Sequence, residues 1–339
     1  MTFDDGLLDD ELALSRADVR LRHLAEGGAR VRREAVAAGE AVVLAVERLS
    51  DSRPRAVVAA GPDSRLLRAV LEPVCPVPFV AWPGLGLPGW AGTLDLVVVL
   101  DPDGRDVATA AAVAEAVRRG CQLVVAAPDG SLVANHAQGR YATVLPTRTG
   151  DQLAVAVVVL DLLDRVHLGP ETDTDVIATA LDEVALRCGP HRDIAVNPAK
   201  ILAIAIADSN PVFWGGTVLA ARAGRRIAES VRRATGRTAL AADAEHLLPV
   251  LAASAPADVF ADPFADGVLE RRPALVLLDD GSADAAVRDT RERLMETAHA
   301  HGVRVETISS EADGDVARYA AMLSTGMYVA AYLQLGHNG

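Results

Sequence analysis

A glutamate and a histidine in the second half of the chain are of the residue types that carry acid–base chemistry. His246 follows Glu229 after the rest of one helix, a strand and a turn, as the sequence predicts these elements. A glutamate in a partly apolar crevice suits a general base, and a histidine can exchange protons near neutral pH. This spacing allows both side chains to face one crevice. Two simpler interpretations stay open: Glu229 pairs with nearby arginines on its own helix, and His246 is a surface residue.

The elements that must position these two residues begin at a helix start. Asn197 and Pro198 mark it, because an Asn side chain caps free N–H groups and Pro suits the first helical position. A short buried strand is expected at 211–214. Glu229 then lies on the next helix, and His246 lies early on the helix after that.

The block from 195 to 250 resembles the second half of the bifunctional phosphoglucose/phosphomannose isomerases, which are sugar isomerase (SIS) domain proteins. The residues on the positions of the family's motifs are Asn197, Pro198, Lys200, Arg222, Glu229 and His246. The departures beside them are Ala228, Ser230, Arg232 and Asp243. The resemblance implies an isomerase that converts glucose or mannose 6-phosphate to fructose 6-phosphate. In it Glu229 would move a proton between C1 and C2, His246 would open the sugar ring and Arg222 would contact the substrate. A site shared between two subunits, as in relatives, is one of the alternatives.

The loop at 101–109 departs further from the family. In SIS domains this loop is rich in serine and threonine and holds the sugar phosphate. Here Gly104 and Thr109 match, but aspartates stand at 101, 103 and 106. Three carboxylates near a phosphate dianion cost several kcal/mol even at an effective dielectric constant of ~20, unless Arg105 or a metal ion neutralises them. Without Arg105 or a metal ion as a neutralising partner, the loop is expected to bind a ligand other than a phosphate, or no ligand. A Mg²⁺ site formed by the three aspartates is the minor alternative.

Three further residues in the first half match the family's substrate-binding turns. Gly61 and Ser64 fall on its glycine–serine turn, and Arg148 falls loosely on its Pro-Arg pair. The resemblance implies substrate contacts for them, while an ordinary strand-to-helix turn explains the first two equally well.

The chain as a whole alternates strands and helices. The apolar segments expected as strands lie at 55–61, 77–82, 94–100, 122–126 and 142–145, then at 211–214, 238–241, 258–260, 274–278 and 303–308. Two amphipathic helices precede them within 10–50. We predict an α/β fold with two tandem doubly wound SIS-like domains, each a five-stranded, mostly parallel sheet flanked by helices. The linker at 168–175 places the N-terminal helices and the first domain at 1–170, and the second domain at 171–339.

Composition and charge narrow the function classes. The net charge of −13 argues against nucleic acid, and no apolar run is long enough to span a bilayer. The three cysteines are far apart and lack metal-ligand spacing, so we expect reduced thiols and a cytoplasmic protein. We expect no cofactor and no metal, a sugar phosphate as ligand, and a homodimer, because the N-terminal helices show more apolar surface than one sheet needs.

Lys200 is the only lysine in the chain. Codon bias toward arginine and a functional role explain this equally well. The helix dipole disfavours a cation on a first turn by a few tenths to ~1 kcal/mol, so we expect a carboxylate or carbonyl partner. We place this contact between domains or subunits, with a structural role, and keep direct ligand contact as the alternative.

The C-terminal helix also matches the family, at Tyr328, Tyr332, Leu333 and Gly336. A catalytic lysine that follows this helix in relatives has no counterpart in the sequence. Two functions therefore stay open: a divergent sugar-phosphate isomerase, and a catalytically silent SIS protein that binds a sugar phosphate or a protein partner as a regulator.

Overall fold

The computed structural model describes residues 3–50, 53–62, 64–254 and 271–337. Its chain forms two compact units, one of residues 27–179 and one of residues 1–26 with 180–339. This division differs from the expected one at 1–170 and 171–339, since residues 1–26 group with the second half of the chain and residues 171–179 with the first.

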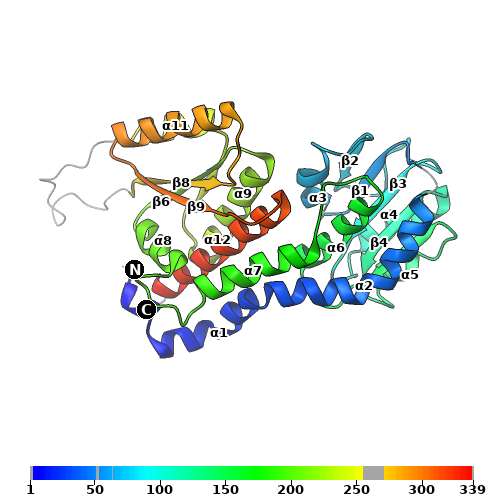
Figure 1. The fold of residues 1–339 in the computed structure, drawn as a ribbon, viewed down its shortest axis with the longest axis horizontal. Helices are drawn as coiled ribbons and strands as arrows, with labels where there is room; N and C mark the ends of the chain where they lie inside the picture. The colour runs from blue at the N-terminus through cyan, green and yellow to red at the C-terminus, as the bar shows by residue number, and fades with distance from the viewer. Residues whose placement is uncertain (1–2, 51–52, 63, 255–270, 338–339) are drawn as a thin grey trace, which may run out of the picture. The chain divides into compact units, whose positions relative to one another are not determined.

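The unit at 27–179 contains the predicted five-stranded parallel sheet (Figure 1). Its strands are β1 (Val57–Ala60), β2 (Phe79–Trp82), β3 (Leu96–Leu100), β4 (Gln122–Ala127) and β5 (Ala142–Pro146). They pair in the order β2-β1-β3-β4-β5, and every pair is parallel. The central strand β3 is buried along its whole length, as its continuous apolar sequence predicts.

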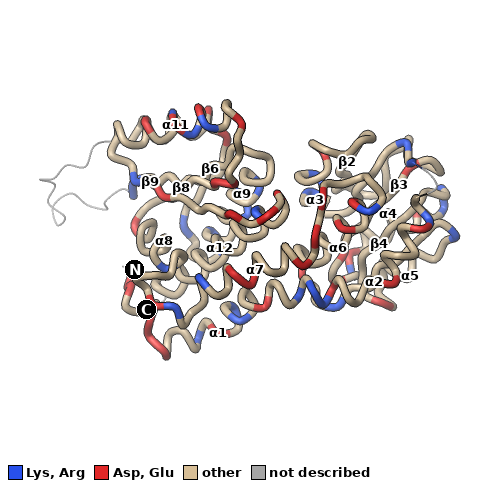
Figure 2. Tube along the Cα trace, in the orientation of Figure 1, with Lys and Arg blue, Asp and Glu red and all other residues tan. Residues whose placement is uncertain are grey.

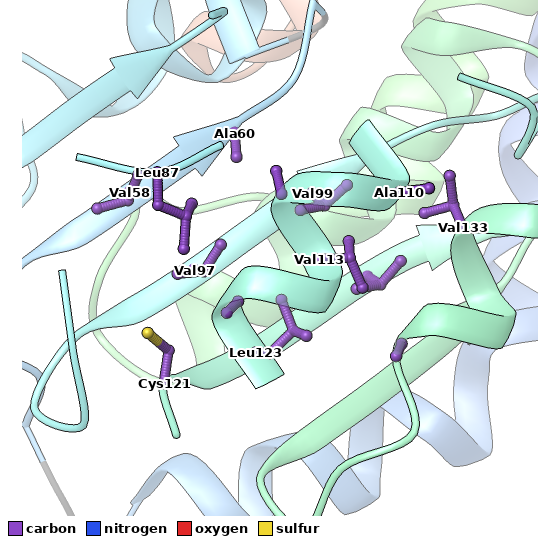
Figure 3. Packing of buried hydrophobic residues seen from close by; sticks show 14 of the residues in the cluster. Val58, Ala60, Leu87, Val97, Val99, Ala110, Val113, Cys121, Leu123 and Val133 are labelled. Carbon is purple, nitrogen blue, oxygen red and sulfur yellow. The ribbon is translucent and has the colours of Figure 1, made fainter. Parts of the chain in front are cut away.

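Helices cover this sheet. They are α2 (Gly27–Ser50), α3 (Ser64–Leu71), α4 (Val107–Arg119), α5 (Leu132–His136) and α6 (Gln152–Arg165), and α7 (Thr174–Cys188) follows. One sheet face packs against α4 and α5 through a cluster of Val, Leu and Ala side chains that includes Val97, Val113 and Leu123 (Figure 3). Helix α4 begins at Asp106, whose carboxylate caps the N–H of Thr109, and ends at Gly120 in the left-handed conformation.

The second unit contains a four-stranded parallel sheet in the order β7-β6-β8-β9. Its strands are β6 (Asn210–Gly215), β7 (Leu240–Ala241), β8 (Pro273–Asp279) and β9 (Arg304–Ser309). Its helices are α1 (Glu11–Ala25), α8 (Pro198–Ile206), α9 (Val218–Thr235), α10 (Ala244–Ala252), α11 (Ala285–Ala300) and α12 (Asp315–His337), and a 3-10 turn at Asp5–Leu8 precedes α1. The strand expected at 258–260 lies outside the described residues.

The two faces of the second sheet carry different helices. Helices α10 and α11 pack on one face, where Leu247 and Leu294 join side chains of β6 and β8 in one core. Helix α9 packs on the other face, since a Cβ atom at Gly224 would lie 3.4 Å from Cβ of Phe213. Helix α12 packs against α9 there, with Gly326 directly over Ile227. Successive side chains of a strand point to opposite faces of the sheet. Phe213 therefore faces α9, while its neighbours Val212 and Trp214 face the α10–α11 core.

The N-terminal helices do not both pack as expected. Helix α2 contacts strand β5 of the first sheet and helix α6, which covers that sheet. Helix α1 instead contacts α12, and the N–H of Asp4 donates to the carbonyl oxygen of Gly336. This short amphipathic helix therefore covers the C-terminal helix of its own chain.

Acidic and basic residues occur in both units (Figure 2). Among the described residues, no helix is both long and apolar enough to cross a membrane. The three cysteines, Cys75, Cys121 and Cys188, are free thiols.

Candidate active site

Glu229 lies near the middle of α9, and its carboxylate contacts two arginines of the same helix. One oxygen is 2.8 Å from Nη1 of Arg226, and the other is 2.5 Å from Nη2 of Arg233. These are i,i+3 and i,i+4 pairs, which the arginine-rich sequence of the helix allows. About 31% of the Glu229 side chain stays exposed. The simpler interpretation therefore describes its contacts, and the carboxylate is still reachable from solvent.

His246 is an exposed residue on the first turn of α10. Its helix covers the sheet face opposite to α9, and it starts at the carboxyl end of β7. Glu229 lies eleven residues beyond the start of α9, about 16 Å along that helix. No hydrogen bond or ion pair joins the two residues in the part of the chain that the structure describes. The helices of the two residues thus cover opposite faces of the sheet, and the common crevice stays a prediction.

Arg222 lies on the second turn of α9, beside Tyr319 of α12. Burial raises the pKa of the Tyr319 hydroxyl, while the charge and hydrogen bond of Arg222 act in the opposite direction. Arg222 itself is half-buried, and its buried Nε atom has no hydrogen-bond partner among the residues that the structure describes. The sequence comparison pointed to Arg222 but gave no role to Tyr319.

The two loops at the carboxyl ends of β1 and β3 meet in the first unit. The order of the sheet reverses between these strands, which is where open α/β sheets bind ligands. Gly61 has a φ of +91°, and a Cβ atom there would lie 3.0 Å from Oγ1 of Thr109. The structure therefore brings together Gly61 and Thr109, two of the residues expected to bind substrate.

The aspartates of the 101–109 loop bind the loop's own donors. The carboxylate of Asp101 accepts hydrogen bonds from the N–H groups of Gly104, at 2.9 Å, and Asp106, at 3.2 Å. The carboxylate of Asp106 accepts from the N–H and the hydroxyl of Thr109, at 2.7 and 2.5 Å. Burial raises the pKa of Asp101, although the two N–H groups lower it. The donors that would hold a phosphate in this loop are thus occupied by carboxylates.

The other expected residues of this region have structural surroundings. Gly104 has a φ of +66° and lies so close to Ser131 that a Cβ atom would be 2.4 Å from the serine Cβ. Ser64 is 1% exposed, and within the described part of the chain its hydroxyl has no hydrogen-bond partner. Asp103, the third aspartate of the loop, is exposed. In the described part of the chain, no three His, Cys, Asp or Glu side chains are grouped as metal ligands.

Arg148 is held by two carboxylates. Its guanidinium pairs with Asp129 at 2.8 Å on the surface. Its N–H donates to the carboxylate of Glu34, which also accepts from the N–H and hydroxyl of Thr149. Glu34 is 1% exposed and was missed by the sequence reasoning. The available signal was its position between Val31 and Ala38, on the buried stripe of α2.

Lys200 is fully buried on the first turn of α8. Its ammonium donates to Asp9 at 2.5 Å and to the carbonyl oxygens of Pro190 and Arg192, both at 2.9 Å. It also lies 5.5 Å from the ring centroid of Tyr332. The expectation of a carboxylate or carbonyl partner is confirmed, whereas its placement between domains or subunits is wrong, because all these partners belong to the same compact unit of the chain.

Comparisons with known proteins agree with this architecture. Residues 195–338 match the family of bacterial phospho-glucose isomerase C-terminal SIS domains. A comparison with curated proteins gave no significant match.

Solved structures share the fold over nearly the whole chain. A proposed phosphosugar isomerase from Silicibacter pomeroyi is 15% identical, with a TM-score of 0.62 over 92% of this chain and 96% of that one. Tagatose-6-phosphate ketose/aldose isomerase from Escherichia coli is 14% identical, with a TM-score of 0.61 over 95% and 94%. The C-terminal domain of glucosamine-fructose-6-phosphate aminotransferase from Francisella tularensis is 11% identical, with a TM-score of 0.60 over 94% and 96%. Residues 195–338 are thus similar to the C-terminal SIS domains of bacterial phosphoglucose isomerases, and the chain shares the fold of these solved structures.

Proposed function

We propose that the protein is an aldose–ketose isomerase that interconverts glucose or mannose 6-phosphate and fructose 6-phosphate. The observation that carries the proposal is the family match over 195–338, because this segment contains both Glu229 and His246. Both side chains are accessible to solvent. The free thiols suit a reducing compartment, and we extend the proposal to the cytoplasm.

Glu229 is proposed as the base. Its carboxylate would remove the proton from C2 of the open-chain aldose. The resulting carboxyl group, whose proton exchanges with water, would then protonate C1 of the enediol, while the hydroxyl proton of O2 passes to O1 to give the ketose. Negative charge develops on the sugar oxygens during this transfer. Arg233, which contacts Glu229, is permanently charged and can stabilise that charge.

His246 is proposed as the group that opens the sugar ring by exchanging a proton with the ring oxygen. It lies on the opposite side of the sheet from α9. We therefore propose that the His246 acting with a given Glu229 comes from a second copy of the chain. This arrangement makes activity depend on assembly.

A second function is favoured by the 101–109 loop. Asp101 and Asp106 occupy the N–H groups that would bind a phosphate. A catalytically silent SIS protein that binds a sugar phosphate or a protein partner as a regulator would need no catalytic geometry. This candidate predicts ligand binding without turnover.

A coupled assay with fructose 6-phosphate separates the two functions. The isomerase proposal expects formation of glucose or mannose 6-phosphate by the wild type and loss of it in Glu229→Gln. Glu296→Gln, which changes an exposed glutamate on α11, is the matched control and should keep activity. Absence of turnover in the wild type, combined with a melting temperature raised by fructose 6-phosphate, would favour the silent regulator.

A further inference from the structure

Four charged residues form a stripe along one side of α9. Arg222, Arg226, Glu229 and Arg233 are spaced at i, i+4, i+7 and i+11, which places them on one helix face. Glu229 is the single acidic residue of this stripe, and it is shared by two of the arginines. The stripe therefore has an excess of positive charge in a protein whose net charge is −13.

The start of the stripe lies against α12. Helices α9 and α12 run in the same direction, because Arg222 meets Tyr319, Ile227 meets Gly326 and the hydroxyl of Ser230 is 2.8 Å from the sulfur of Met327. Both helices begin after parallel strands of one sheet, β6 and β9. Their positive ends are therefore directed to the same edge of the sheet.

The guanidinium groups of Arg222 and Arg226, at the start of the stripe, have N–H donors that a ligand could use. Arg222 is half-buried, makes no ion pair among the described residues and leaves its buried Nε without a partner. Arg226 keeps 36% of its side chain exposed beside Glu229. Two acidic groups at these helix starts are engaged with other partners, Asp280 with the Thr217 hydroxyl and Asp315 with Arg318. Guanidinium groups bind phosphate oxygens through paired N–H donors.

We propose that Arg222 and Arg226 bind the phosphate of the ligand at the α9–α12 seam, and that the 101–109 loop does not bind it. The seam is defined by Arg222, Arg226 and Tyr319. The identity of the ligand as a sugar phosphate rests on the proposed function, whereas anion binding at the seam needs no turnover. Arg222 and Glu229 are seven residues apart, about 10 Å along the helix. A six-carbon sugar with a terminal phosphate can bridge this separation, so one helix would hold the phosphate and present the base.

Titration calorimetry tests the seam directly, with inorganic phosphate and fructose 6-phosphate as the two ligands. The wild type should bind both, and unphosphorylated fructose should bind at least tenfold more weakly. Arg222→Gln and Arg226→Gln should each lower the affinity for phosphate at least tenfold. Arg225→Gln is the matched control, because Arg225 is an exposed residue of the same helix outside the stripe, and it should bind as the wild type does.

Thr109→Val probes the competing site. Under the proposal its affinity for phosphate equals that of the wild type, and a tenfold loss in this variant would overturn the proposal in favour of the 101–109 loop. Wild-type affinity in both seam variants, or no phosphate binding by the wild type, would also overturn it. Circular dichroism of each variant verifies that the fold is kept. The two proposals can fail separately. If the seam variants lose phosphate binding and the wild type has no isomerase activity, the seam is supported and only the isomerase proposal is contradicted.

Discussion

At the scale of single residues, Lys200 shows how a buried charge can hold a terminal segment. Its three ammonium donors are used by Asp9 and by the carbonyl oxygens of Pro190 and Arg192. Asp9 also accepts from the N–H of Ile194. The contact therefore joins the segment before α1 to the loop before α8.

Replacement of Lys200 by methionine should lower the free energy of unfolding by about 2–4 kcal/mol, because two carbonyl oxygens and a carboxylate lose their donor. Lys200→Arg should also be destabilising, since the planar guanidinium does not fit an enclosure built for an ammonium. Chemical denaturation measures both effects. Asp9→Asn should cost less, as 42% of the Asp9 side chain is exposed and the carbonyl contacts persist. Unchanged stability in both Lys200 variants would favour codon bias as the reason for the single lysine.

His337 predicts a pH dependence of stability. Burial, followed by the charges of Arg237 and Arg271, lowers the pKa of His337 from its ordinary value of 6.5. The unfolded chain thus binds a proton at a pH where the folded chain does not. The stability that depends on neutral His337 is complete above the unfolded pKa and falls as the pH drops from there toward the lower folded pKa.

His337→Gln should reduce the loss of stability between about pH 7.5 and pH 5, because the variant has no group to titrate there. Thermal unfolding across this range measures the difference. His299→Gln, an exposed histidine on α11, is the control and should follow the wild-type curve. Parallel curves for wild type and His337→Gln would show that His337 does not titrate as inferred.

At the scale of elements, a buried carboxylate joins α2 to the loop after β5. Glu34 accepts hydrogen bonds from the N–H groups of Arg148 and Thr149 and from the Thr149 hydroxyl. Glu34→Ala leaves these donors unsatisfied in a buried position and should lower the free energy of unfolding by about 2–4 kcal/mol. Glu34→Gln keeps one acceptor oxygen and should cost less. Equal stability of Glu34→Ala and the wild type in urea titrations would contradict this account.

Most elements could be predicted from the sequence, because their apolar periodicity and caps are local. The helix start at Asn197 and the continuous apolar strand at 96–100 are examples. The short helix α5 was missed, since five residues carry too little periodicity. The packing of α1 on α12 was also missed, because it joins segments more than 300 residues apart in the sequence, as the Arg20–Gln334 hydrogen bond shows.

The candidate site could be predicted only in part. The sequence identified the aspartates of the 101–109 loop, but whether they face a ligand or the loop's own N–H groups depends on backbone geometry. It likewise paired Glu229 with His246 from their spacing, whereas the order of strands in the sheet places their helices on opposite faces. The partners of Glu229 were among the alternatives because they lie on the same helix.

At the scale of the whole molecule, we propose a homodimer. Leu12 and Val19 of α1 are 63% and 85% exposed and are seven residues apart on one stripe. Val19 lines a groove of about 610 Å³ between α1 and α12, whose other lining residues include Leu7, Ala331 and Leu335. A second copy of this helix would bury the stripe.

Light scattering at micromolar concentration should give twice the chain mass. Val19→Asp should shift the protein toward the monomer, because it places a charge in an apolar contact. Leu85→Asp changes a leucine that is 79% exposed outside α1 and should leave the mass unchanged. A monomeric wild type would contradict the dimer and, with it, the proposed contribution of His246 from a second copy.

Proton exchange at the sugar carbons tests the central claim, that Glu229 transfers a proton between C1 and C2 of a hexose 6-phosphate. Fructose 6-phosphate is incubated with the protein in D₂O, and magnetic resonance follows deuterium at C1 of the ketose and C2 of the aldose product. The account predicts deuterium incorporation by the wild type at a rate lowered roughly 10²–10⁴-fold in Glu229→Gln. A wild type that binds fructose 6-phosphate but exchanges no proton would contradict it, as would full exchange in Glu229→Gln.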